Sequence, residues 1–242
     1  MREEFDRTVA LVGKEGLEKL HQAAVAVFGI GGVGSFAAEA LARAGVGKLI
    51  LVDPDLVERS NINRQLHATQ KTIGFPKVLV MKERILSIVP WARVVTKRIR
   101  YQPQTASMLL NSGYSYIVDA MDDVLAKVDL IARARQMGIP LISSMGAANR
   151  INVAGFRVLD ISETSGCPLA RQIRRGLRRL DINSGVKVVS SAEPIIETTY
   201  HLRELENKPR LWGSISFVPP VVGLLMVGEC IRDLLNMEGR TV

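Results

Sequence analysis

A glycine-rich turn between two apolar runs constrains the fold of this 242-residue chain more than any other feature. Residues 25–28 are apolar and rich in Val, as expected of a buried parallel strand. Residues 35–44 are rich in Ala and Leu and contain no proline, which predicts a helix. A second apolar run, 49–52, ends at Asp53. The segment therefore predicts a strand, a turn, a helix and a second strand, and the turn contains Gly29, Gly31, Gly32 and Gly34.

This turn and Asp53 together predict a nucleotide-binding site. A backbone that turns sharply and approaches a phosphate closely needs residues without a Cβ atom. The N-terminus of the following helix offers free N–H groups to an anion, and an acidic residue ending the second strand is placed to bind ribose hydroxyls. The alternative is a tight turn in an ordinary βαβ unit, which leaves the fourth glycine and Asp53 unexplained.

The rest of the chain alternates predicted strands and helices. This alternation indicates an α/β fold with a Rossmann-like, doubly wound, mostly parallel sheet. Residues 151–159 predict an additional antiparallel strand, and residues 213–235 a strand-like start followed by a helix. We expect a single domain over 1–242, with an arginine-rich, partly mobile insertion at 161–209. The other predicted elements are helices at 1–22 (broken at Gly13 and Gly16), between Pro76 and Pro90, and at 105–110, 124–137 and 168–180, and strands at 94–99, 116–118, 139–143 and 186–190.

The net charge and the cysteine content indicate which partners and which cellular compartment to expect. The net charge of +8 points to a polyanionic partner or an anionic substrate, with solubility alone as the alternative. The two cysteines form no CxxC pair, so we expect no disulfide framework and no structural zinc, and a reduced cytoplasmic location. The N-terminus lacks the apolar core of a signal peptide, and residues 215–227 are too short to span a bilayer. We therefore expect no membrane insertion.

Polar side chains after Asp53 form the first candidate binding cluster. Arg64 and Lys77 are cations that can neutralise the oxygens of a triphosphate, and Arg can do so bidentately. Asn61 and Gln65 lie in the same polar loop, where side chains more often bind than pack. The alternative is a solvated polar loop.

A second cluster, DAMDD, follows the strand predicted at 116–118. Its carboxylates belong to Asp119, Asp122 and Asp123, at the edge where such sheets bind ligands. Carboxylates beside phosphates suit Mg²⁺. One of them can instead cap the next helix; we expect Asp123 to be the cap and Asp122 the metal ligand.

The segment CPLARQIRRGLRRL predicts a helix with one basic and one apolar face. Like charges at helical spacing repel one another, which an RNA phosphate backbone would relieve, whereas a solvated basic face is the alternative. An aromatic content of 5% gives little support for stacking several bases. Cys167 at its start is either a catalytic thiol or, as we expect, a buried or capping residue. The basic face consists of Arg171, Arg174, Arg175, Arg178 and Arg179, and the apolar face of Leu169, Ile173, Leu177 and Leu180.

Four separated motifs resemble those of the ubiquitin-activating-enzyme-like adenylases, the superfamily of ThiF, MoeB and HesA. They are GIGGVGS, DPDLVERSNINRQ, GFPK and DAMDD, in the order and spacing of that superfamily. The later segments SGCPLARQIRRGLR and GSISFVPPVVGLLMVGECIRDLL resemble the branch that dehydrates threonylcarbamoyladenosine in tRNA. That branch typically has Asp before PLAR, where this chain has Cys167. The CxxC pairs usual in sulfur-carrier activators are missing from the sequence.

The resemblance implies an ATP- and Mg²⁺-dependent cyclisation of the modified adenosine. It implies that the glycines and Asp55, Asn61, Arg64, Gln65 and Lys77 bind ATP, with Asp53 on the ribose and Asp122 on Mg²⁺. Arg7 resembles an arginine that reaches the ATP of a neighbouring subunit, which implies a homodimer. A cysteine desulfurase or sulfur-acceptor system is an open partner. The alternatives are an activator of a small sulfur-carrier protein and, from another class, a nicotinamide-dependent oxidoreductase.

Overall fold

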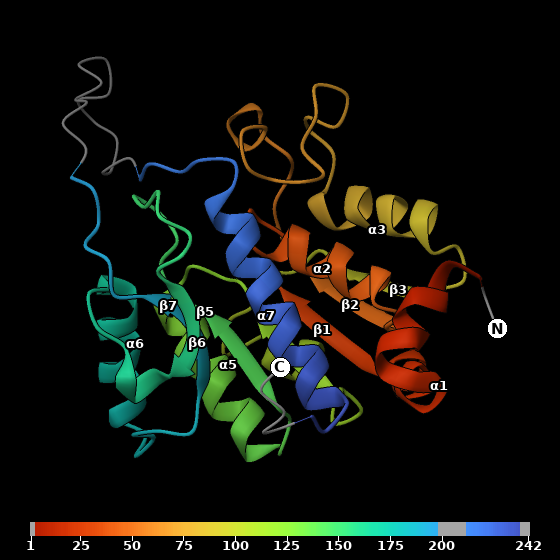
Figure 1. The fold of residues 1–242 in the computed structure, drawn as a ribbon. Coiled ribbons are helices and arrows are strands. Elements are labelled where there is room, and N and C mark those ends of the chain that lie inside the picture. The colour runs from red at the N-terminus through yellow and green to blue at the C-terminus, as the bar shows by residue number, and fades with distance from the viewer. Residues whose placement is uncertain (1–2, 198–211, 238–242) are drawn as a thin grey trace.

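The computed structural model describes residues 3–197 and 212–237, and a single twisted sheet runs through them (Figure 1). The strand order is β3-β2-β1-β4-β5-β7-β6, and every neighbouring pair is parallel except β6 and β7. This arrangement confirms the doubly wound, mostly parallel sheet and its antiparallel addition. The strands are β1 (Ala24–Phe28), β2 (Lys48–Val52), β3 (Arg93–Lys97), β4 (Tyr116–Asp119), β5 (Leu141–Ser144), β6 (Phe156–Asp160) and β7 (Lys187–Ser191).

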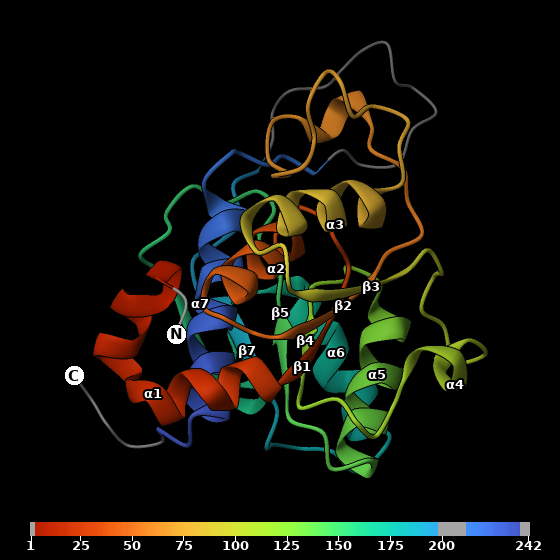
Figure 2. The ribbon, with the colours of Figure 1, turned by 90° about the vertical axis from the view of Figure 1, so that its right-hand side faces the viewer.

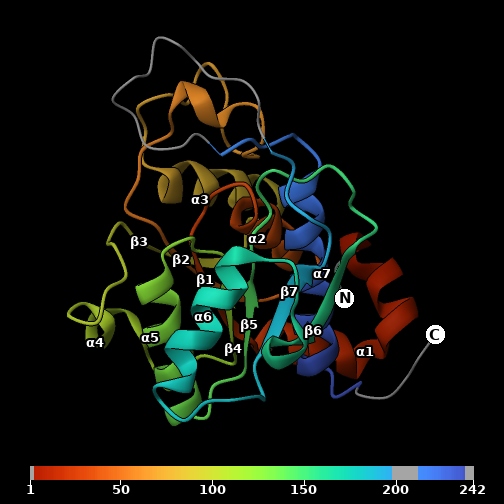
Figure 3. The same cartoon turned by 90° about the vertical axis from the view of Figure 1, so that its left-hand side faces the viewer.

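Helices cover both faces of the sheet (Figure 2). Alternate residues of β1 point to opposite faces: Val25 and Val27 pack with α2, α3 and α7, whereas Ala26 and Phe28 pack with α4 and α5. A third apolar cluster joins α5 to α6, which lie side by side (Figure 3). The helices are α1 (Asp6–Gln22), α2 (Gly34–Arg43), α3 (Lys77–Ile88), α4 (Ala106–Leu109), α5 (Val124–Gln136), α6 (Pro168–Arg178) and α7 (Val218–Leu234), with short 3₁₀ turns η1 (Glu3–Phe5), η2 (Arg59–Asn61) and η3 (Ile161–Glu163).

Several predicted boundaries were wrong, each for a local reason. The strand predicted at 151–159 begins only at Phe156, because the Asn152 side chain accepts a hydrogen bond from the Ala154 N–H at 3.0 Å and turns the chain. Residues 213–217 form no strand, and α7 begins with two prolines in its first turn. Leu180 lies beyond the end of α6 and is 50% exposed, so it is not a core residue.

The first helix kinks at only one of its two glycines. Gly13 has φ +75°, outside the helical region, whereas Gly16 is buried within the helix. None of the described helices combines the length and the apolar character that a membrane span requires. The assignment of all 242 residues to one domain stays a prediction, and residues 198–211 of the predicted mobile insertion lie outside the described residues.

Candidate nucleotide-binding site

A cavity of about 1180 Å³ opens at the carboxyl ends of the parallel strands. Its wall is built by the glycine turn after β1, the loop after β2, the turn after β4, the loop after β5 and the start of α6. Such a crevice is where doubly wound sheets bind ligands. All the cofactor-binding residues predicted from the sequence line it except Arg7 and Gly34.

The glycine turn requires glycine at two positions. Gly29 has φ +85°, and a Cβ atom there would lie 2.7 Å from the carbonyl oxygen of Ala120. A Cβ atom on Gly34 would lie 1.8 Å from the carbonyl oxygen of Gly29, so Gly34 forms the tight closure of the turn rather than its lining. Gly31 and Gly32 line the cavity, just before the N-terminus of α2.

Asp53 is used by the backbone around it. Its Oδ2 accepts a 2.6 Å hydrogen bond from the Ile30 N–H in the glycine turn, and its Oδ1 a 2.8 Å bond from the Asp55 N–H. The residue is only 5% exposed, and burial raises the pKa of its carboxyl group although Lys77 opposes the shift. Asp53 therefore joins the end of β2 to the glycine turn.

Asp55 presents a freer carboxylate to the cavity. Its side chain is 50% exposed and accepts a 3.0 Å hydrogen bond from Nζ of Lys77, which is itself buried at the start of α3. Arg100, which the sequence analysis did not single out, lies 3.6 Å from the same carboxylate. The predicted cation Lys77 thus reaches the cavity, together with a second cation from the segment after β3.

The loop containing η2 brings the remaining predicted residues to the same wall. Arg64 packs against Gly32, and its guanidinium donates to the backbone oxygen of Ser60 and to the Asn63 side chain, both at 2.9 Å. Asn61 is buried and accepts a hydrogen bond from the Glu58 N–H at 3.1 Å. Gln65 is also buried, and its Oε1 has no hydrogen-bond partner in the described chain.

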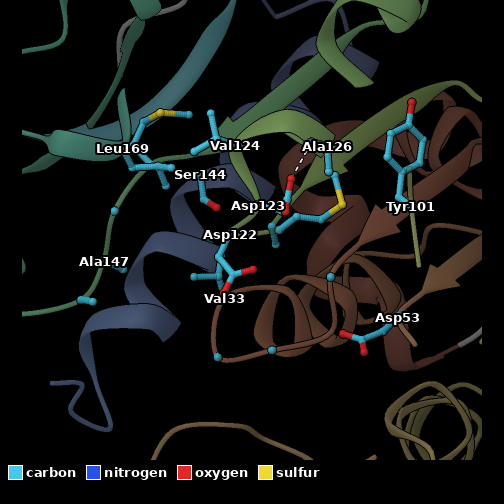
Figure 4. A pocket seen from close by; sticks show the side chains of 18 of the residues that line it. Val33, Asp53, Tyr101, Asp122, Asp123, Val124, Ala126, Ser144, Ala147 and Leu169 are labelled. Atoms are coloured by element: carbon cyan, nitrogen blue, oxygen red, sulfur yellow. Dashed lines mark hydrogen bonds between the residues drawn. The ribbon is translucent and has the colours of Figure 1, made fainter. Parts of the chain in front are cut away.

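The three carboxylates in the turn after β4 have different environments. Asp123 caps α5 by accepting a 2.7 Å hydrogen bond from the Ala126 N–H, which confirms the predicted cap. Asp119 is fully buried, bonded to Lys127 Nζ at 2.9 Å and to the Ser143 hydroxyl at 2.7 Å. Asp122 is left exposed at the cavity, between Asp53 on one side and Ser144, Ala147 and Leu169 on the other (Figure 4).

Sequence reasoning missed Lys127, which has no exposed side-chain area. Burial lowers the pKa of its amino group, while the Asp119 carboxylate opposes the shift. The signal was present in the pattern of α5, because Lys127 precedes the buried Leu130, Ile131 and Ala134 at helical spacing. A Lys in such an apolar stripe needs a buried acid as its partner.

The far side of the cavity is formed around the start of α6. Cys167 caps this helix: its Sγ accepts from the Ala170 N–H at 3.5 Å and the Gly146 N–H at 3.4 Å. Arg150, also missed from the sequence, is 3% exposed and lines the cavity. Its guanidinium donates to the backbone oxygens of Gly146, Gly166 and Glu193, and so connects three segments of this wall.

The arginines of α6 do not form one uniform face. Arg174 turns inward and donates to the backbone oxygen of Thr164 at 2.7 Å and to the Thr164 hydroxyl, which corrects its predicted place on the basic face. Arg171, Arg175, Arg178 and Arg179 are exposed. Arg7 is exposed on α1 and lies outside the cavity lining.

A doubly wound sheet with a glycine turn and cations at its carboxyl edge is the arrangement of Rossmann-type nucleotide-binding proteins. The model of the ThiF family matches residues 5–241, and the chain belongs to that family. It is 44% identical over 244 residues to the tRNA threonylcarbamoyladenosine dehydratase of Bacillus subtilis, covering 98% of this chain and 96% of that protein.

Two further relatives distinguish the branches of the family. The crystal structure of Escherichia coli tRNA N6-threonylcarbamoyladenosine dehydratase, TcdA, in complex with ATP matches with a TM-score of 0.89 and 33% identity, covering 100% of this chain and 97% of that one. The sulfur carrier protein adenylyltransferase of Thermus thermophilus is 36% identical over 146 residues, covering 58% of this chain and 54% of that protein. Similarity to the dehydratases therefore extends further along this chain.

Proposed function

We propose that this chain uses ATP to cyclise threonylcarbamoyladenosine in tRNA. The observation that carries the proposal is the similarity to dehydratases over nearly the whole chain, including the segments that build the α6 side of the cavity. The sulfur-carrier relative matches little more than half of the chain, which makes that activity the second candidate.

ATP would lie with its phosphates at the glycine turn and the N-terminus of α2. There, backbone N–H groups and the cations Arg64 and Lys77 can neutralise phosphate charge. Asp53 and Asp55 both line the cavity beside the glycine turn, and either carboxylate can accept a hydrogen bond from a ribose hydroxyl, because an oxygen that accepts one backbone hydrogen bond keeps a second acceptor site. Asn61 and Gln65, from the same loop as Arg64, complete the proposed ATP site.

Asp122 fits a role as a magnesium ligand. It is exposed at the cavity, while its neighbour Asp123 is used as the helix cap. The described residues contain no cluster of three or more His, Cys, Asp or Glu able to hold a metal. Mg²⁺ commonly binds one or two carboxylates together with substrate phosphates, and it would supply charge neutralisation there.

The proposed chemistry has two balanced steps. A carboxylate oxygen of the threonylcarbamoyl group attacks the α-phosphorus of ATP, the bond to the bridging oxygen breaks, and pyrophosphate leaves. A nitrogen of the same group then attacks the activated acyl carbon; AMP leaves with the acyl oxygen and the nitrogen loses its proton. The nucleoside loses one water. Positioning and charge neutralisation by Arg64 and Lys77 suffice for this route, so no protein nucleophile is needed.

The proposal also includes a surface that binds RNA and a second subunit. The exposed arginines of α6 would bind the phosphate backbone of tRNA next to the cavity. Arg7 would reach the ATP of a second copy in a homodimer, a role that its exposure outside its own cavity permits. A reduced cytoplasmic compartment suits the two buried free thiols, Cys167 and Cys230. A sulfur-transfer partner is a weaker proposal that rests on resemblance alone.

The test is to incubate the protein with ATP, Mg²⁺ and tRNA carrying threonylcarbamoyladenosine. We expect a nucleoside lighter by one water on mass analysis, with AMP and pyrophosphate formed in equal amounts. Pyrophosphate exchange that depends on a small sulfur-carrier protein and not on tRNA would favour the second candidate. Stabilisation against heat by NAD(H) but not by ATP with Mg²⁺ would contradict both.

A further inference from the structure

The cavity has a second part, which we call the acceptor compartment, on the far side of Asp122 from Asp53 (Figure 4). It is bounded by the loop after β5, the first turns of α6 and the segment preceding α7. Its wall includes Ser144 at the end of β5 (Figure 4), Arg150 in the loop after β5 and Gln172 on α6, and the hydrogen bonds between Asn149 and Gly213 hold Trp212 next to the same loop.

Trp212 differs from the other tryptophan of the chain in its surroundings. The chain contains two tryptophans. Trp91 packs edge-on against Phe5 and His21, where it joins α1 to the end of α3. Trp212 instead lines the cavity and remains 51% exposed. A half-exposed aromatic side chain that lines a cavity is typical of sites that stack a planar ligand.

Asn149 fixes the backbone next to Trp212. Its N–H donates to the Gly213 oxygen at 2.8 Å, and its Oδ1 accepts from the Gly213 N–H at 2.5 Å. The backbone oxygen of Asn149 accepts a hydrogen bond from the Ile196 N–H at 2.8 Å. Asn149 holds this geometry in the left-handed region, at φ +54°, which Asn tolerates better than most residues. Trp212 therefore directly precedes a residue whose backbone is held in place by Asn149.

The acceptor compartment also adjoins the exposed arginines. Gln172 lines the cavity on α6, and Arg171 precedes it on the same helix turn. An RNA backbone bound along α6 would therefore bring a nucleotide to the side of the cavity that contains Trp212. Single-stranded bases are commonly read by stacking on aromatic side chains.

We propose that the acceptor compartment takes the modified adenine base of the RNA and that Trp212 stacks on it, with the acyl chain directed toward Asp122. This inference rests on the proposed cyclisation. It assigns to Trp212 a binding role that is separate from the ATP site, and it makes Asn149 a positioning residue for that role.

Trp212→Ala tests the assignment. We expect KM for the modified tRNA to rise roughly 5- to 150-fold, the range measured when a base-stacking aromatic is removed. Stabilisation by ATP should stay unchanged. Trp212→Phe should recover most of the loss and Trp212→Leu should not, because only Phe retains an aromatic face. Met108→Ala, at a 62% exposed apolar residue outside the cavity lining, is the matched control and should leave KM unchanged.

A second measurement keeps Trp212 intact, so its result does not depend on whether the Trp212 variants fold. In Trp91→Phe, Trp212 is the remaining tryptophan, and the modified hairpin RNA should quench its fluorescence. The same hairpin with an abasic site at the modified position should quench far less. Equal quenching by both RNAs, or an unchanged KM in Trp212→Ala, would overturn the stacking while leaving the cyclisation standing. A wild-type protein that forms no cyclic nucleoside would refute the proposed function instead.

Discussion

Removing the amino group of Lys127 should destabilise the protein severely, although the residue touches no ligand site directly. Its Nζ donates to Asp119 Oδ2 at 2.9 Å, to the Asp119 backbone oxygen at 3.3 Å and to the Ser143 hydroxyl at 3.0 Å. In Lys127→Met a side chain of similar length replaces these donors with apolar atoms. Among the described residues, the fully buried Asp119 carboxylate then keeps the Ser143 hydroxyl and the Met121 N–H as its side-chain hydrogen-bond partners.

The magnitude follows from leaving a buried carboxylate without its counter-charge. Breaking a buried ion pair by removing one partner costs about 3–5 kcal/mol of unfolding free energy. For a chain of this size each kcal/mol shifts the unfolding temperature by roughly 2–4 °C. We therefore expect Lys127→Met to unfold about 6–20 °C below the wild type.

A double-mutant cycle separates the ion pair from lost packing. Urea unfolding is measured for Lys127→Met, Asp119→Asn and the combined variant, with the exposed Lys14→Met as the matched control. The combined variant should cost clearly less than the sum of the single changes, because it leaves no unpaired buried charge. Single variants within about 1 kcal/mol of wild type, or strictly additive costs, would refute the reasoning.

Three further predictions follow from the same geometry. Asp122→Ala should abolish formation of the cyclic nucleoside while RNA binding persists, as seen by nucleoside mass and by filter binding; retained turnover would contradict the metal assignment. Neutralising Arg171, Arg175 and Arg178 together should weaken tRNA binding and reduce the slope of log K against log salt by roughly 2–3, and an unchanged slope would exclude α6 as the RNA surface. Burial lowers the pKa of His67 in the folded state to about 4, against 6.5 in the unfolded state. As the pH falls below 6.5, the unfolded state therefore binds a proton that the folded state does not. About 3 kcal/mol of stability should therefore be lost between pH 6.5 and pH 4, and His67→Phe should show a flatter acid limb in urea titrations.

The sequence predicted the nucleotide half of the molecule well because its determinants are local. The glycine turn, the flanking strands and the cap by Asp123 each depend on residues a few positions apart. The same holds for Cys167, whose place before a proline at a helix start predicted its capping role. Patterns of this kind survive without knowledge of the tertiary structure.

The errors arise where contacts span long stretches of chain. Nothing near Trp212 in the sequence indicates that Asn149 binds its neighbour Gly213. Helical spacing alone placed Arg174 with the exposed arginines, whereas the Thr164 backbone draws it inward. The hydrogen bond that Asp53 accepts from the Ile30 N–H, 23 residues away in the chain, likewise has no local signal in the sequence.

The insertion between β5 and β7 explains how one nucleotide fold can serve a reaction on RNA. A regular βαβ crossover would place one helix between these strands, but here β6, η3 and α6 intervene, and the start of α6 becomes part of the cavity wall. The wall therefore presents, in spatial order, the glycine turn, Asp122 and the base of an arginine-bearing helix (Figure 4). That order matches the chemical requirement, because the acyl group must lie between the α-phosphate that activates it and the RNA that carries it. If α6 began further from the carboxyl end of β5, ATP and the RNA could both bind but their reacting groups would lie too far apart.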